Sequence, residues 1–96
     1  MIRHTVAFRL KHASGSPEEA AFLKSADVLK AIPGVQKFEK LRQVSGKNDF
    51  AFGFSMEFAD QAAYDGYNTH PEHIRFVEER WKPEVADFLE IDYAGL

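Results

Sequence analysis

Two histidines and a tyrosine within seven residues form the part of this sequence best suited to chemistry. Tyr67, His70 and His73 lie in the segment 67–73, and Pro71 separates the two histidines. Proline is tolerated at the first position of a helix because the N–H that it lacks would have no partner there. We therefore predict that His70 caps a helix and that His73 lies in its first turn. A histidine beside an apolar helix face is either a buried, hydrogen-bonded group or a group that transfers protons.

The chemistry that these residues could perform is acid–base catalysis on a carbonyl compound. A neutral His73 could accept a proton near pH 7, while the Tyr67 hydroxyl polarises a carbonyl or stabilises an enolate. His4 lies on the apolar face of the first predicted strand and is expected to face the same space. The alternative is that His73 and His4 only satisfy buried hydrogen bonds.

Other types of site find less support in the sequence. A metal site made of His4, His70 and His73 lacks an Asp, Glu or Cys at a supporting spacing, and a capping role turns His70 away. We therefore expect no metal and no cofactor. His12 is predicted to lie in a loop.

Composition excludes several classes of protein. The 96 residues, 45% of them hydrophobic, predict one domain over residues 1–96 that folds around a single core. With a net charge of −3 and both signs interspersed, the chain is not expected to bind nucleic acid. The absence of cysteine excludes disulfides and thiolate chemistry. No apolar run approaches the length of a membrane span, and no signal peptide is recognisable, so we expect a cytoplasmic protein without a membrane partner.

Periodicity predicts the secondary structure. Alternating apolar residues predict strands, helical spacing with caps predicts helices, and Pro33 and Pro83 are expected to end the helices before them. The predicted elements are a strand at 2–11, a helix at 16–32, strands at 35–44 and 50–58, a helical region from 60 to 81 broken at 69–71, and a strand at 85–93. The order β-α-β-β-α-β indicates an α+β ferredoxin-like plait with both helical layers on one face of the sheet.

The strand at 50–58 has two contrasting faces. One face carries aromatic residues, and the other carries Ala51, Gly53 and Ser55, which suggests close approach by a second subunit at these three positions. A ligand pocket is expected on the aromatic side, between sheet and helices. The residues expected to line it are Phe8, Phe22, Phe52, Phe54, Val77 and Trp81.

Three segments resemble the stress-responsive dimeric α+β barrel (Dabb) family: the opening strand at 2–11, residues 32–35, and residues 67–73 with Phe76 after them. The resemblance covers essentially the whole chain. It implies a plait that pairs sheet to sheet with a second copy to form a barrel. One branch, the plant polyketide cyclases, uses a His–Tyr pair that falls on His73 and Tyr67, with a first-strand histidine at His4. This chain departs from that branch at two pocket positions, since Phe52 stands where the branch has a histidine on the third strand and Ser25 stands where it has a tyrosine on the first helix.

Three functional hypotheses follow. The first is a homodimer of Dabb type that binds a small apolar or aromatic molecule between sheet and helices. The second is a cofactor-free enzyme of cyclase or isomerase type, a lyase in the broad sense, with His73 as general base and Tyr67 as its partner. The third is a structural, stress-protective oligomer. An open cavity beside His73 would favour the first two hypotheses over the third.

Overall fold

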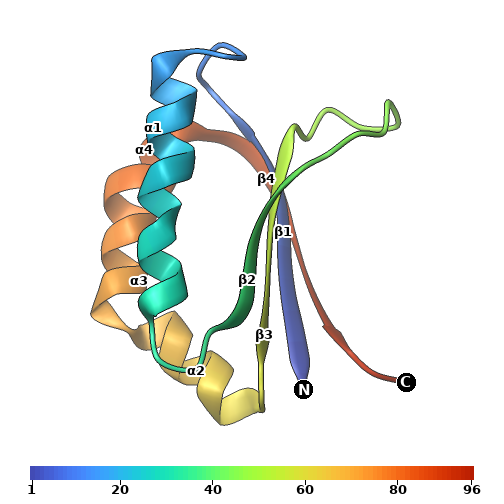
Figure 1. Cartoon of the computed structure of the whole chain (residues 1–96), viewed down its shortest axis with the longest axis vertical. Coiled ribbons are helices and arrows are strands. Elements are labelled where there is room, and N and C mark those ends of the chain that lie inside the picture. Colours follow the sequence, from blue (N-terminus) through green and yellow to red (C-terminus); the bar gives the residue numbers. More distant parts are fainter.

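The computed structural model describes all residues from 1 to 96. Four antiparallel strands form one sheet in the order β2-β3-β1-β4, and all the helices cover one face of it (Figure 1). In chain order the elements are β1 (Ile2–Leu10), α1 (Pro17–Ser25), the 3₁₀ helix η1 (Ala26–Ala31), β2 (Gln36–Arg42), β3 (Phe52–Phe58), α2 (Gln61–Thr69), α3 (Pro71–Phe76), the π-helical turn η2 (Val77–Trp81), α4 (Lys82–Glu84) and β4 (Val85–Ala94). This is the ferredoxin-like α+β arrangement that the sequence predicted.

The first helical segment begins as expected and then changes type. The Ser16 hydroxyl accepts a hydrogen bond from the Glu19 N–H at 3.2 Å, and Pro17 occupies the first helical position. The helix predicted for 16–32 is α1 followed by a 3₁₀ helix, which ends before Pro33. Gly34 then has a φ of 92°, a backbone conformation that side chains disfavour. The prediction was therefore right about a helical segment and wrong about its uniformity.

The last helical segment extends beyond the predicted end at Trp81. The Lys82 N–H donates to the Val77 carbonyl, five residues earlier, which defines a π turn between α3 and α4. In a regular helix, a proline ring meets the carbonyl four residues before it. The wider turn ends at Trp81, two residues before Pro83, and the chain stays helical to Glu84. None of the helices combines the length and hydrophobicity needed to span a bilayer.

Two strands, β2 and β3, are shorter than predicted. β2 covers Gln36–Arg42, and β3 begins at Phe52 instead of Phe50. The Asn48 side chain accepts a hydrogen bond from the Phe50 N–H at 3.0 Å, which keeps Phe50 in the preceding turn. Ala51 lies just before β3, and its N–H donates to the Phe8 carbonyl at 3.1 Å.

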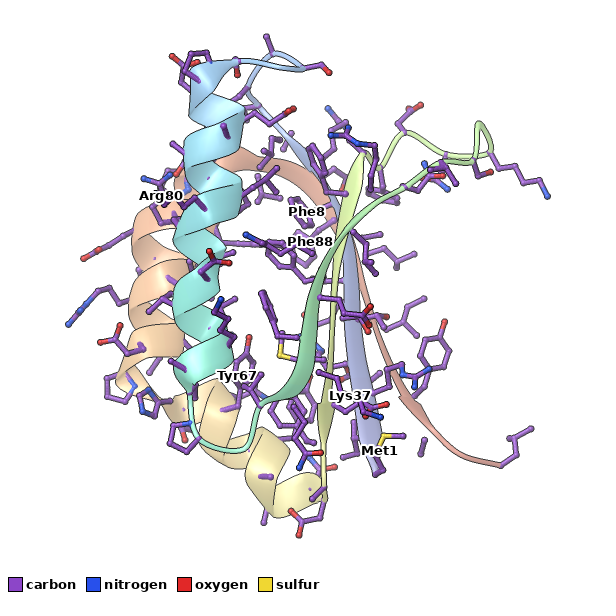
Figure 2. The ribbon with its side chains drawn as sticks, viewed as in Figure 1. Met1, Phe8, Lys37, Tyr67, Arg80 and Phe88 are labelled. Carbon is purple, nitrogen blue, oxygen red and sulfur yellow. The ribbon has the colours of Figure 1, made fainter.

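The hydrophobic core fills the space between the helices and the sheet (Figure 2). The side of the sheet that faces the helices is called the covered face. Phe8 of β1 and Phe22 of α1 are fully buried at the centre of the core, with their ring centroids 5.7 Å apart. The opposite side of the sheet has no helix over it and is called the open face (Figure 1).

A bulge decides which residues of β4 lie on each face. Leu10 pairs with Val85 and Arg9 pairs with Asp87, so the strand gains one residue between these pairs. Val85 is consequently buried on the covered face. Beyond the bulge, Leu89, Ile91 and Tyr93 lie on the open face, and the covered face receives Phe88, Glu90 and Asp92. The bulge therefore brings two carboxylates to the helix side of the sheet.

Candidate functional site

A cavity of about 350 Å³ lies between the covered face and the helices. Figure 2 shows Tyr67 and Phe88 in this space. Its walls are mainly apolar, with a group of polar side chains at the end nearest α2. The lining residues are His4, Val6, Leu29, Phe54, Met56, Tyr67, Asn68, His73, Phe76, Val77, Trp81, Lys82, Phe88 and Glu90.

The predicted pocket residues divide into two groups. Phe54, Val77 and Trp81 line the cavity. Phe8, Phe22 and Phe52 do not, which corrects the expectation for these three. They are buried in the packed core, where the Phe8 ring contacts those of Phe22 and Phe52 at centroid distances of 5.7 and 5.8 Å. Because Phe8 packs against both Phe22 and Phe52, these three rings fill the core and do not line the cavity.

His70 and Pro71 position His73. His70 is the N-cap of α3, and its Nδ1 accepts a hydrogen bond from the Glu72 N–H at 3.1 Å. Pro71 takes the first helical position. His73 then lies one turn into the helix, where it meets Tyr67 of α2. The two ring centroids are 4.4 Å apart and the rings are tilted by 46°. The rings are in contact, and no hydrogen bond joins the two side chains.

A backbone hydrogen bond decides which nitrogen of His73 carries the proton. Nδ1 lies 3.2 Å from the Asn68 carbonyl oxygen, which can only accept, so Nδ1 is the donor. In the neutral ring this leaves Nε2 with a free lone pair. Burial lowers the pKa of His73 below its usual value, against smaller opposing effects of the Asn68 carbonyl and Glu90. His73 is therefore neutral at pH 7 and has the form that a general base requires.

Tyr67 has the complementary character. Its side chain is buried, and no hydrogen bond within the chain engages its hydroxyl. Burial, with a smaller contribution from the charge of Glu90, raises the pKa of Tyr67. The hydroxyl therefore remains protonated and can donate to a carbonyl or hydroxyl oxygen of a bound molecule.

His4 is held by residues from two other elements. Its Nδ1 lies 2.5 Å from Asp92 Oδ1, because the two residues face each other in the β1–β4 register. The Tyr64 hydroxyl donates to Asp92 Oδ2 at 2.7 Å and lies 3.1 Å from His4 Nδ1. Burial and then the Asp92 carboxylate raise the pKa of Tyr64, so its hydroxyl stays a donor. This network fixes the orientation of the His4 ring at the polar end of the cavity.

Sequence reasoning missed Tyr64, Asn68, Glu90 and Asp92. The helical signal was available for two of them, because Tyr64, Tyr67 and Asn68 follow the i, i+3, i+4 spacing that puts side chains on one helix face. The two acids are separated by one residue on a strand, which puts them on one side of the sheet. Their placement on the covered face depends on the bulge, for which the sequence carries no clear signal.

The groups best placed to hold a metal ion are His4, Glu90 and Asp92, whose ligand atoms lie within 4.8 Å of one another. The trio of His4, His70 and His73 considered from the sequence is not assembled, because His70 serves as a helix cap. His4 and Asp92 are already hydrogen-bonded to each other and to Tyr64, which explains the proximity of these groups without an ion. His12 pairs with Glu84 at 2.7 Å, outside the cavity lining.

The residues predicted to meet a second subunit lie on the open face or at its border. Gly53 and Ser55 belong to β3 and face away from the helices, whereas Ala51 precedes the strand. Beside them, the open face carries large apolar side chains. Leu41, Leu89, Ile91 and Tyr93 are 46, 51, 38 and 53% exposed.

Comparison with known families gives a match over nearly the whole chain. The sequence profile of the Stress Responsive A/B Barrel Domain family (Dabb) matches residues 2–94, which is nearly the whole chain. No curated protein matches the chain.

Solved structures give further matches. A protein of Mesorhizobium loti described as a Dabb-family protein with a ferredoxin-like fold is 64% identical, with a TM-score of 0.97 over 99% of this chain and 96% of that one. A dimeric ferredoxin-like protein of unknown function from Thermobifida fusca is 20% identical, with a TM-score of 0.79 over 98% of this chain and 90% of that one. The hydroxynitrile lyase of Passiflora edulis is 16% identical, with a TM-score of 0.83 over 96% of this chain and 90% of that one.

Proposed function

Because the chain belongs to the stress-responsive A/B barrel (Dabb) family, we propose that it is a homodimer that binds a small apolar or aromatic molecule between its sheet and its helices. One observation carries the proposal: a cavity of about 350 Å³ with nine hydrophobic residues among its fourteen lining residues. Ligand sites are typically cavities of roughly 300–1,000 Å³ with apolar walls and a few polar groups that fix orientation.

The cavity has an apolar part and a polar part, which would bind different parts of a ligand. Phe54, Met56, Phe76 and Trp81 offer aromatic and thioether surface that favours a flat apolar body. Tyr67, Asn68 and His73, on α2 and the first turn of α3, provide polar groups at the end of the cavity nearest α2. A molecule with an apolar body and one polar end therefore fits this cavity best.

Filling the cavity tests the binding proposal. Val77 lines the cavity, so Val77→Trp should occupy the space and abolish binding of phenolic ligands, measured as shifts in the amide NMR spectrum. Val28→Trp is the matched control, because Val28 is 37% exposed and outside the lining. Equal binding by both variants and the parent would contradict a site in this cavity. Absence of binding by the parent across a broad panel would leave only the hypothesis of a structural oligomer.

The open face supports the dimer. Large apolar side chains in a contiguous exposed patch are typical of interaction surfaces, and proteins of this fold from Thermobifida fusca, Bacteroides fragilis and Jannaschia are described as dimeric. Pairing open face to open face about a two-fold axis would cover the patch in both copies.

Acid–base catalysis is the second candidate function, and a different observation favours it. His73 presents a neutral Nε2 as acceptor while the Tyr67 hydroxyl, in the same cavity, is an unengaged donor. Removal of a proton next to a carbonyl requires a base of this kind and a donor for the developing enolate oxygen. The Passiflora lyase indicates that this fold accommodates lyase chemistry in another protein.

Exchange of carbon-bound protons tests this second function without knowledge of the substrate. Benzoylacetone has an aromatic body and acidic protons between two carbonyls, and its exchange in D₂O is followed by NMR. The parent should accelerate exchange over buffer, and His73→Gln should remove most of the acceleration, typically about a hundredfold for a lost general base. Tyr67→Phe, which removes only the hydroxyl, should have a smaller effect. A parent that does not accelerate exchange would contradict the catalytic proposal and leave the binding proposal standing.

A further inference from the structure

One carboxylate in the cavity lining has no cationic partner. Glu90 lies on the covered face of β4, an edge strand, and none of the ion pairs of the chain includes it. Its Oε1 is 3.4 Å from the Tyr64 hydroxyl, but that hydroxyl lies closer to Asp92, at 2.7 Å, and has one proton to donate. Glu90 therefore retains acceptor capacity at the entrance of the cavity.

The lysine in the same lining does not neutralise this charge. Lys82 Nζ lies 2.5 Å from Glu78 Oε1, one helical turn earlier on η2, so its charge is matched on the helix. Glu90 also influences groups deeper in the cavity, since its charge raises the pKa of Tyr67 and opposes the lowering of the pKa of His73. Glu90 is thus the charged lining residue that no ion pair offsets.

Aromatic rings stand beside this carboxylate. Phe88 precedes Glu90 by two residues on the same face of β4, and its ring meets that of Trp81 edge to face at a centroid distance of 5.6 Å. Both rings line the cavity, and Phe88 is half exposed. The faces of aromatic rings attract cations, and a carboxylate beside them adds direct charge attraction.

We propose that Glu90 is the specificity-determining residue of the cavity and selects ligands that carry an ammonium group on an aromatic body, while it disfavours carboxylic acids. The proposal rests on the cavity being a ligand site and names the class of ligand. The aromatic body lies against the apolar wall, and the ammonium group meets Glu90 beside the half-exposed ring of Phe88. A hydroxyl in the same place donates one hydrogen bond and gains less.

Three probes of nearly equal size and different charge test the proposal: 2-phenylethylamine, 2-phenylethanol and phenylacetate, titrated at pH 7 and followed by amide NMR shifts. Because Glu90 is exposed, its charge is partly screened. The amine should bind about three- to tenfold more tightly than the alcohol, and phenylacetate more weakly than either. In Glu90→Gln, which keeps size and loses charge, the amine and the alcohol should bind within about twofold of each other.

A neighbouring acid provides the matched control. Glu79 on η2 is exposed, lies outside the lining and forms no ion pair, so Glu79→Gln should keep the full preference for the amine. Equal binding of the three probes by the parent, or an unchanged preference in Glu90→Gln, overturns the proposal and leaves the cavity as a ligand site. If no probe binds, the selectivity proposal falls, and the Val77→Trp experiment with phenolic ligands decides separately whether the cavity binds ligands at all.

Discussion

The covered and open faces of the sheet are built from alternate residues of the same strands, yet they differ in how they are completed. On β3, Phe54 and Met56 are buried under helices while Gly53 and Ser55 face outward. On β4 the pattern is reversed, because Ile91 and its apolar neighbours face outward. A strand pattern thus specifies two faces, but the helices of this chain cover only one.

This difference separates the two kinds of function that the molecule supports. The covered face is completed within one chain, and the cavity remains where its packing is incomplete. The open face exposes apolar area that another molecule must cover to gain its hydrophobic stabilisation. Substitutions on the covered face should therefore act on folding and ligand binding, and substitutions on the open face should act on association.

The largest expected effect is on the covered face. Phe8 is fully buried, so Phe8→Ala should reduce the free energy of unfolding by about 3–5 kcal/mol, the usual range for truncation of a buried aromatic ring. Phe88 pairs with Phe8 across the strands and is 50% exposed, so Phe88→Ala is the matched control and should lose much less. Urea denaturation of both variants gives the comparison. Equal losses would mean that burial in one chain does not distinguish the two rings.

The next effect is on the open face. Ile91→Lys puts a charge into the proposed interface and should weaken the dimer at least tenfold, which corresponds to about 1.4 kcal/mol. The exposed Ile74 of α3 lies on the helical side, so Ile74→Lys should leave association unchanged. Sedimentation equilibrium measures both. Dimers of equal affinity would show that the open face is not the interface.

The sequence predicted the fold well because its signals were local. The cap at Ser16, the proline before His73 and the alternation in β1 each depend on neighbours within a few residues, and each is seen in the structure. The errors arose where another interaction changed a local pattern. The hydrogen bond from the Phe50 N–H to the Asn48 side chain keeps Phe50 in the turn, so β3 begins two residues later than predicted. The π turn at Val77–Trp81 is followed by further helical residues, so the last helix extends beyond Trp81.

The candidate site was less predictable because it depends on contacts between residues that are far apart in the sequence. His73, Tyr67 and His4 line one cavity, and the sequence predicted that His4 and His73 face the same space. The partners that orient them could not be foreseen from spacing, since Asp92 reaches His4 only through the register of β4 with β1. Whether a buried phenylalanine lines a cavity or fills the core is likewise decided by packing, as Phe8 and Phe54 show.

A smaller effect distinguishes the polar end of the covered face from its apolar centre. Tyr64→Phe removes the hydroxyl that donates to Asp92 and should lower the free energy of unfolding by about 1–2 kcal/mol. The reason is that a hydrogen bond to a charged group contributes more to stability than a hydrogen bond between neutral groups. Tyr93 lies on the open face and is 53% exposed, so Tyr93→Phe should change stability by less than about 0.5 kcal/mol. Thermal unfolding of the two variants at pH 7 tests this. A larger loss in Tyr93→Phe would reverse the comparison.

The smallest expected effect is a change in how stability depends on pH. Burial lowers the pKa of His73 in the folded chain, so at pH below about 6.5 the unfolded chain takes up a proton before the folded chain does. The contribution of His73 is therefore complete above this pH and is lost as pH falls through the lowered pKa. Since the ring is partly exposed, the loss should stay below about 1 kcal/mol. In His73→Gln, urea denaturation at pH 7.0 and 5.0 should show a correspondingly smaller difference in stability. An unchanged difference would mean that His73 titrates alike in both states, which would remove the argument that the cavity keeps it neutral.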